Sequence, residues 1–123
     1  MANTIAPARD HAFHEQSGRC IYCGAPMWAH SPDRYAKAHH ISLADAGRFQ
    51  LTAEHLKPRS EGGGNSRDNI VAACLFCNQK RHQRKVVPAP DKYRDFVQKR
   101  IARGKWHPEH LHSKVLTQRS RPV

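Results

Sequence analysis

Residues 51–85 of this 123-residue chain read LTAEHLKPRSEGGGNSRDNIVAACLFCNQKRHQRK. Two stretches within or beside this segment, residues 49–56 and 69–75, carry strand-forming side chains and flank a turn with three consecutive glycines. The stretch 75–86 lacks Gly and Pro and is rich in Gln, Lys and Arg, which favours a helix. The segment therefore predicts a strand, a glycine-rich turn, a second strand and a helix.

The rest of the chain is expected to supply flanking helices and two tails. Apolar residues recur at helical spacing between residues 91 and 103, which predicts an amphipathic helix, and a shorter helix is expected over residues 33–40. After Trp106 the chain is basic, and we expect it to be mobile. We therefore divide the chain into an N-terminal arm (1–15), a core (16–90), a C-terminal helix (91–104) and a basic tail (105–123).

Four cysteines are arranged as two C-x-x-C pairs. Thiolates at positions i and i+3 can bind one ion when the chain turns tightly between them, and a glycine directly after the first pair favours such a turn. Free buried cysteines and a redox dithiol are the alternatives, but a redox pair normally accompanies a βαβ pattern, which the sequence lacks. The pairs predict one closed, structural Zn²⁺ site formed by Cys20, Cys23, Cys74 and Cys77.

The charge and the apolar content of the chain indicate the kind of partner it binds and the compartment in which it works. The chain has 21 Lys and Arg against 10 Asp and Glu, a net charge of +11, which favours a polyanionic partner. No stretch approaches the roughly 20 apolar residues that span a bilayer, and residues 1–14 lack the apolar centre of a signal peptide. We therefore expect no membrane partner and an intracellular, cytoplasmic location, where paired cysteines bind metal more often than they form disulfides.

The adjacent residues Glu54 and His55 are candidates for chemistry on a phosphodiester. Such hydrolysis needs a base, a divalent cation and side chains that hold the phosphate backbone. The imidazole of His55 suits the base, whereas Glu54 and Asn78 offer oxygen ligands for Mg²⁺ or Mn²⁺. His82 follows Asn78 by four residues and is expected to be a further ligand or a phosphate contact. Neighbouring strand residues point to opposite faces, so the strand must end or bend here if both serve one site.

The order Glu54-His55, Gly62-Gly63, Asn69 and Cys74-x-x-Cys77-Asn78 resembles the HNH endonuclease family in its zinc-knuckle form. The resemblance implies an α+β fold of the ββα-metal type, with a β-hairpin packed on a helix and flanking helices around it. It also implies one catalytic ion between hairpin and helix, and cleavage that leaves 5′-phosphate and 3′-hydroxyl ends.

The resemblance further implies a role for each matching residue. His55 corresponds to the general base, Glu54 and Asn78 correspond to the ligands of the catalytic ion, and Asn69 corresponds to the residue that braces the loop between the strands. Two positions depart from the usual pattern. Glu54 stands where Asp is usual, and its extra methylene shifts the ion by about 1 Å. Asn78 stands where many members have His, which favours Mg²⁺ or Mn²⁺ over transition metals.

Basic residues in and beside the motif are expected to contact DNA phosphates, with Lys80 on the helix beside the scissile backbone. They are Lys57, Arg59, Lys80, Arg81, Arg84 and Lys85. The sequence thus predicts a metal-dependent endonuclease that acts on double-stranded DNA. We expect it to be a monomer or weak dimer. A non-catalytic, zinc-stabilised DNA-binding module and a nuclease directed at RNA remain open as alternatives.

Overall fold

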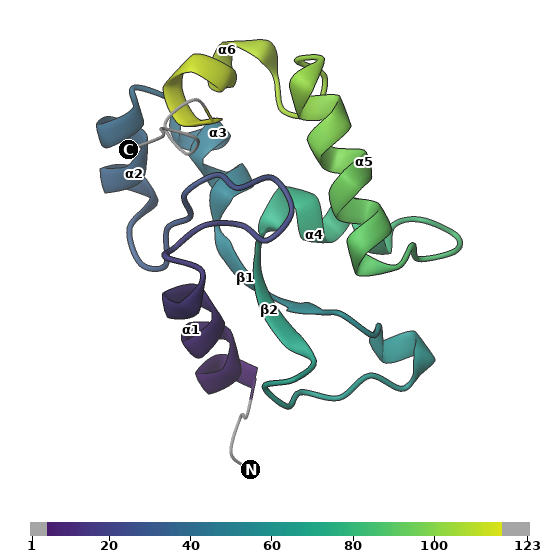
Figure 1. Cartoon of the computed structure of the whole chain (residues 1–123). Coiled ribbons are helices and arrows are strands. Elements are labelled where there is room, and N and C mark those ends of the chain that lie inside the picture. The colour runs from purple at the N-terminus through teal and green to yellow at the C-terminus, as the bar shows by residue number, and fades with distance from the viewer. Residues whose placement is uncertain (1–4, 117–123) are drawn as a thin grey trace.

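The computed structural model describes residues 5–116. Its helices and strands are α1 (Ile5–Glu15), α2 (Pro32–His39), α3 (Leu43–Ala46), β1 (Leu51–His55), β2 (Ile70–Cys74), α4 (Leu75–His82), α5 (Pro90–Ala102) and α6 (Glu109–Leu111). Short 3₁₀ turns lie at η1 (Gly47–Phe49) and η2 (Arg59–Glu61), and a π-helical turn, η3 (His112–Leu116), ends the described part. Figure 1 shows the hairpin at the centre with the helices around it. This mixture of helices and one small sheet confirms the predicted α+β fold.

The strands β1 and β2 form an antiparallel hairpin, in which Leu51 pairs with Cys74 and His55 pairs with Ile70. Helix α1 packs against both strands. The Gln16 side chain donates to Ala72 O (2.8 Å) and accepts from Ala72 N (2.9 Å), so it satisfies the outer edge of β2. The N-terminal arm is thus a helix docked on the hairpin, and residues 1–4 lie outside the described part.

The loop between the strands is held by Asn69. Its Oδ1 accepts from Lys57 N (2.8 Å), and its Nδ2 donates to Lys57 O (3.1 Å) and to Gly64 O (2.8 Å). A Cβ at Gly63 would lie 1.8 Å from Lys57 O, so no larger residue fits there. Asn69 therefore makes the bracing contacts that the family resemblance implies, and the glycine-rich turn is closely packed at its centre.

The segment after Trp106 was expected to be mobile, but as far as residue 116 it packs on the core. Leu111, Val115 and Leu116 are buried in it. His107 is 2% exposed, and its Nδ1 accepts from Arg48 Nε at 3.2 Å. Burial and the neighbouring Arg48 charge lower the pKa of His107 to about 3, so its ring is neutral. The remainder of the predicted basic tail, residues 117–123, lies outside the described part.

The other helices lie close to their predicted positions. Helix α2 spans Pro32–His39, and α5 spans Pro90–Ala102 with Gly104 at φ +71° just beyond its end, as a helix C-terminus favours. Helix α4 ends at His82, four residues before the predicted end at 86. The loop after it carries Val86, which is 80% exposed.

Replacing Leu111 with Ala should lower the free energy of unfolding of the zinc-loaded protein by about 2–5 kcal/mol, because it leaves a cavity in the core. Val86→Ala, at an exposed position, should change it by less than about 0.5 kcal/mol. Urea denaturation followed by circular dichroism measures both. Equal, small effects of the two substitutions would mean that the C-terminal segment does not belong to the core.

Candidate metal centre and catalytic pocket

The four cysteines converge at the point where β2 passes into α4. Their sulfur atoms all lie within 4.8 Å of one another, and all four residues are buried. The Sγ atoms of Cys23 and Cys74 are 3.9 Å apart, far beyond the roughly 2.05 Å of a disulfide bond. A tetrahedral zinc ion with bonds of about 2.3 Å holds its sulfur ligands about 3.8 Å apart. The cluster therefore fits a four-thiolate zinc site.

The electrostatics of the cluster also call for a cation. Burial raises the pKa of the Cys23 and Cys77 thiols well above the ordinary value. Burial also acts to raise the pKa of Cys20, but hydrogen bonds from the other three cysteines outweigh it and lower that pKa. Four thiolates so close together would repel one another, and a divalent cation supplies the charge that they require.

Local structure holds the two cysteine pairs in place. Gly24, at φ +79°, lets the chain turn back after the first pair, and its N–H donates to Cys20 O. Cys74 is the N-cap of α4, because its Sγ accepts from Cys77 N at 3.5 Å. Trp106 Nε1 donates to Cys77 Sγ at 3.2 Å, so this indole packs on the knuckle. The metal centre thus fixes where α4 begins.

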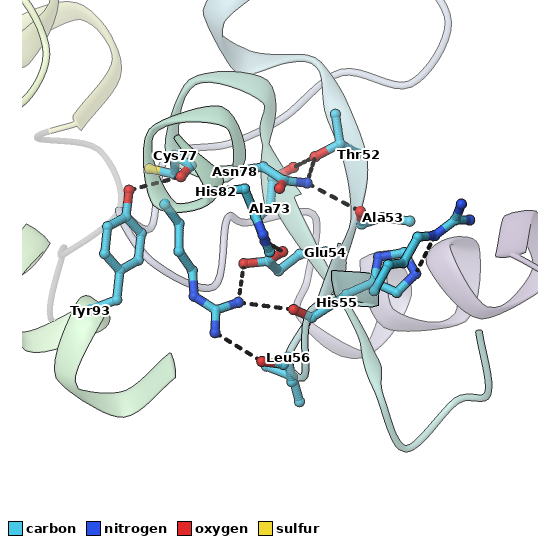
Figure 2. A network of polar contacts seen from close by, with 12 residues as sticks. Thr52, Ala53, Glu54, His55, Leu56, Ala73, Cys77, Asn78, His82 and Tyr93 are labelled. Carbon is cyan, nitrogen blue, oxygen red and sulfur yellow. Dashed lines mark hydrogen bonds and ion pairs between the residues drawn. The ribbon is translucent and has the colours of Figure 1, made fainter. Parts of the chain in front are cut away.

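Glu54 lies fully buried, with 0% exposure, between β1 and α4. Its Oε2 accepts from the Tyr22 hydroxyl (2.6 Å) and from Arg81 Nη1 (2.9 Å), and its Oε1 lies 2.6 Å from His82 Nε2. Figure 2 shows His82 and Glu54 facing one another in this network. Burial, reinforced by the Glu54 charge, raises the pKa of Tyr22, so its hydroxyl keeps its proton and donates.

Arg81 was expected to contact a DNA phosphate, and the structure corrects this expectation. Its side chain is 1% exposed, and all five N–H groups of the guanidinium have acceptors. The acceptors are Glu54 Oε2 and the backbone carbonyls of His55, Leu56 and Pro88. Arg81 therefore holds the end of β1 and the loop before α5 together, and it has no N–H left for a phosphate.

An open pocket of about 330 Å³ lies in front of this network, and we call it the catalytic pocket. Its lining includes His55, Arg59, Asn78 and His82. Asn78 Nδ2 donates to Thr52 Oγ1 (3.0 Å) and to Ala53 O (3.1 Å), which leaves its Oδ1 without a hydrogen bond to any described residue. The residues predicted as base and helix ligands thus share one pocket, whereas the buried Glu54 reaches it through His82.

The donor atoms in this region suit a divalent cation. Glu54 Oε1, Asn78 Oδ1 and His82 Nε2 combine a carboxylate, an amide oxygen and an imidazole. Adjacent ligands of an octahedral ion with bonds near 2.1 Å lie about 3 Å apart, so the 2.6 Å between Glu54 Oε1 and His82 Nε2 needs only a small separation. Glu54 Oε1 and His82 Nε2 therefore lie close enough for one ion to bind both, and Asn78 lines the same pocket as His82.

The His55 ring is held by a residue that the sequence did not single out. Its Nε2 lies 2.8 Å from Asn65 Oδ1, in the loop between the strands. An amide oxygen only accepts, so Nε2 carries the hydrogen and the lone pair lies on Nδ1. Arg59 Nε lies farther away, 3.4 Å from the same Nε2. The short Asn65 contact therefore determines which nitrogen of His55 can accept a proton.

The other predicted phosphate contacts lie at three separate places. Lys57 and Arg59 are exposed in the loop after β1, and Arg59 lines the catalytic pocket. Lys80 and Arg84 line a different pocket from that of His55. Lys85 is exposed in the loop that follows α4.

An antiparallel hairpin that leads directly into a helix, with a four-thiol centre at their junction, defines the ββα-metal class with a zinc knuckle. Residues 43–84 match the model of the HNH endonuclease family, which spans the hairpin, α4 and the second cysteine pair. The predicted resemblance is therefore confirmed for this segment, which makes up about a third of the chain. No curated protein and no solved structure gives a significant match.

A helix that crosses a bilayer needs about 20 consecutive apolar residues. Within residues 5–116, none of the helices is long and apolar enough to cross a membrane.

Cys74→Ser should abolish stoichiometric zinc binding and unfold the domain, because zinc bound to such sites contributes on the order of 10 kcal/mol. Metal analysis after dialysis should give about one zinc per wild-type chain and none in the variant. Ser113→Ala, at an exposed position, serves as the control and should keep its zinc. A folded, zinc-free Cys74→Ser protein would contradict the structural role.

Arg81→Met should destabilise the domain by about 3–5 kcal/mol, because it leaves the buried Glu54 carboxylate without its cation. Lys85→Met removes one exposed charge from the neighbouring loop and should change stability by less than about 0.5 kcal/mol. Denaturant unfolding of both variants in the presence of zinc measures the difference. If Arg81→Met unfolds like wild type, the ion pair is not a structural element.

Proposed function

We propose that this chain is a metal-dependent HNH endonuclease that hydrolyses phosphodiester bonds in double-stranded DNA. The observation that carries the proposal is the catalytic pocket, in which His55, Asn78 and His82 meet in front of the buried Glu54. The family match and the excess of basic residues support a nucleic-acid substrate.

In the proposed reaction, His55 is the general base. Its Nδ1 accepts a proton from the attacking water, while Nε2 keeps its hydrogen and donates it to Asn65 Oδ1. Asn65 is a positioning residue in this scheme, because it selects the tautomer and fixes the ring without touching the substrate. Arg59, exposed in the same pocket, binds a non-bridging oxygen of the scissile phosphate.

Glu54, Asn78 and His82 would hold the catalytic ion, Mg²⁺ or Mn²⁺. When bound, that ion would neutralise charge on the phosphate and assist departure of the 3′ oxygen. Tyr22 and Arg81 orient the Glu54 carboxylate from behind, leaving Oε1 as the oxygen that faces His82 and the pocket.

We propose a separate role for each part of the chain. Residues 16–90 form the nuclease core, and residues 91–104 form a supporting helix. A structural zinc ion is held by the cysteines, and four reduced thiols favour an intracellular, cytoplasmic setting. We propose a monomer or weak dimer as the active form.

One observation favours a second candidate, a non-catalytic DNA-binding module. Both Glu54 oxygens are engaged by protein groups, so a catalytic ion must displace the contact from His82. If that contact is not displaced, the domain binds DNA with strong salt dependence and cleaves none.

His55→Ala should reduce nicking of supercoiled plasmid in Mg²⁺ or Mn²⁺ by at least about a hundredfold, because it removes the proton acceptor. His30→Ala, at an exposed position far from the motif in sequence, is the matched control and should nick like wild type. Gel electrophoresis over time gives the rates, and zinc content and circular dichroism verify folding. RNA duplex in parallel reactions tests the choice of substrate.

Equal nicking by wild type and His55→Ala would refute the base role. Plasmid binding without nicking by the wild type, in either metal, would instead support the non-catalytic module.

A further inference from the structure

A second pocket, of about 340 Å³, lies between α4 and α5 and plays no part in the proposed chemistry. Four cationic side chains, from α4, α5 and the loops that follow them, line it, and we call it the cation pocket: Lys80, Arg84, Arg100 and Lys105. Its remaining lining is aromatic, from Phe76, Phe96 and Trp106. Arg100 and Lys105 lie outside the family match, so the pocket is built partly by this chain's own C-terminal region.

Aromatic rings hold three of the four cations in position. The Arg84 guanidinium lies 4.6 Å and the Arg100 guanidinium 5.6 Å from the centre of the Phe96 ring. Lys80 Nζ lies 5.6 Å from the centre of the Phe76 ring. Each contact is a cation–π interaction, which restrains a long side chain that would otherwise be free. The pocket is therefore organised before any ligand arrives.

The rings are in turn tied to the metal centre. Trp106 packs edge-on against Phe76 (5.3 Å between ring centres) and against Phe96 (5.8 Å). The same indole donates to Cys77 Sγ. Phe96 is 36% exposed, so it forms an open wall of the pocket rather than part of the core.

No carboxylate lines the pocket, and none of its four cations forms an ion pair within residues 5–116. Four like charges held together in this way repel one another and favour an anionic ligand. Several cations spread around an open pocket match a chain of phosphates, which carries one charge per nucleotide.

The cation pocket faces away from the catalytic pocket. Residues 78 and 80 of α4 are separated by about 200° around the helix axis, since each residue turns the helix by about 100°. Asn78 lines the catalytic pocket and Lys80 lines the cation pocket. A helix is about 10 Å wide with its side chains, so one phosphate cannot occupy both places.

We propose that the cation pocket binds backbone phosphates of the nucleic-acid substrate at a distance from the bond that is cleaved. This inference rests on the proposed function, because the pocket would bind the same nucleic-acid substrate. It concerns binding of that substrate and not its cleavage. It makes Arg100, Lys105 and Phe96 binding residues, and it reassigns Lys80 and Arg84 from the scissile phosphate to this remote contact.

The test measures binding of a fluorescent DNA duplex of about 24 base pairs without added Mg²⁺ or Mn²⁺, across a series of salt concentrations. The double variant Arg100→Gln/Lys105→Gln removes two pocket cations. Its matched control, Lys92→Gln/Lys99→Gln, removes two exposed cations that do not line the pocket, also on α5. We expect the pocket variant to bind at least about tenfold more weakly and its salt slope to fall by about 1.8, with far smaller changes in the control.

Phe96→Leu tests the organising role of the ring, because it keeps every charge and removes the cation–π partner. We expect binding about threefold weaker with little change in the salt slope. Circular dichroism and zinc content establish that each variant is folded. Should Phe96→Leu fail to fold, the double variant alone decides.

Equal losses in the pocket and control variants would overturn the proposal, because the effect would then be general charge. No loss in the pocket variant would overturn it as well. A wild type that binds DNA but never cleaves it would refute the proposed nuclease and leave this inference standing. If the wild type cleaves DNA and the pocket variant binds it normally, the proposed nuclease stands and this inference is refuted.

Discussion

The convergence of four buried thiols at the end of β2 is the constraint on which the rest of the structure depends. It joins a knuckle near the N-terminus to a hairpin and helix that lie about 50 residues later in the sequence. Closing so long a loop costs entropy, which the binding of a metal ion offsets. Because Cys74 also caps α4, the centre fixes the first turn of the helix that carries Asn78 and His82.

The knuckle contributes to the candidate site through Tyr22, which lies between its two cysteines. The Tyr22 hydroxyl and Arg81 approach the same oxygen of Glu54, and together they fix a carboxylate that is completely removed from water. Burying this charge is tolerable because a cation and a hydroxyl compensate it. The same compensation weakens the charge that Glu54 offers to a metal. The contacts with Tyr22 and Arg81 therefore both orient the Glu54 carboxylate and weaken it as a candidate metal ligand.

Local patterns in the sequence were enough to predict the hairpin, the helices and the cysteine cluster. Strand-forming residues around three glycines and the C-x-x-C spacing are signals that a few neighbouring residues carry. The burial of Arg81 has no such signal, because its acceptors are mostly backbone carbonyls at the end of β1 and in the loop before α5. Asn65 was equally hidden within a polar turn, and the docking of residues 106–116 arises from tertiary packing around Leu111 and His107. For the contact of Tyr22 with Glu54, the one signal in the sequence is the position of Tyr22 between the first two cysteines.

Helix α4 brings these features together, since each of its sides has a different task. Arg81 is turned inward to Glu54, Asn78 and His82 face the catalytic pocket, and Phe76 and Lys80 face the cation pocket. A slip of one residue would rotate all three sets by about 100° and misplace them together. Two contacts of the thiol centre oppose such a slip. Cys74 caps the start of the helix, and Trp106 donates to Cys77 and packs on Phe76. A metal ion bound by the four thiols would thus set the rotational position of both surfaces that we propose contact the substrate.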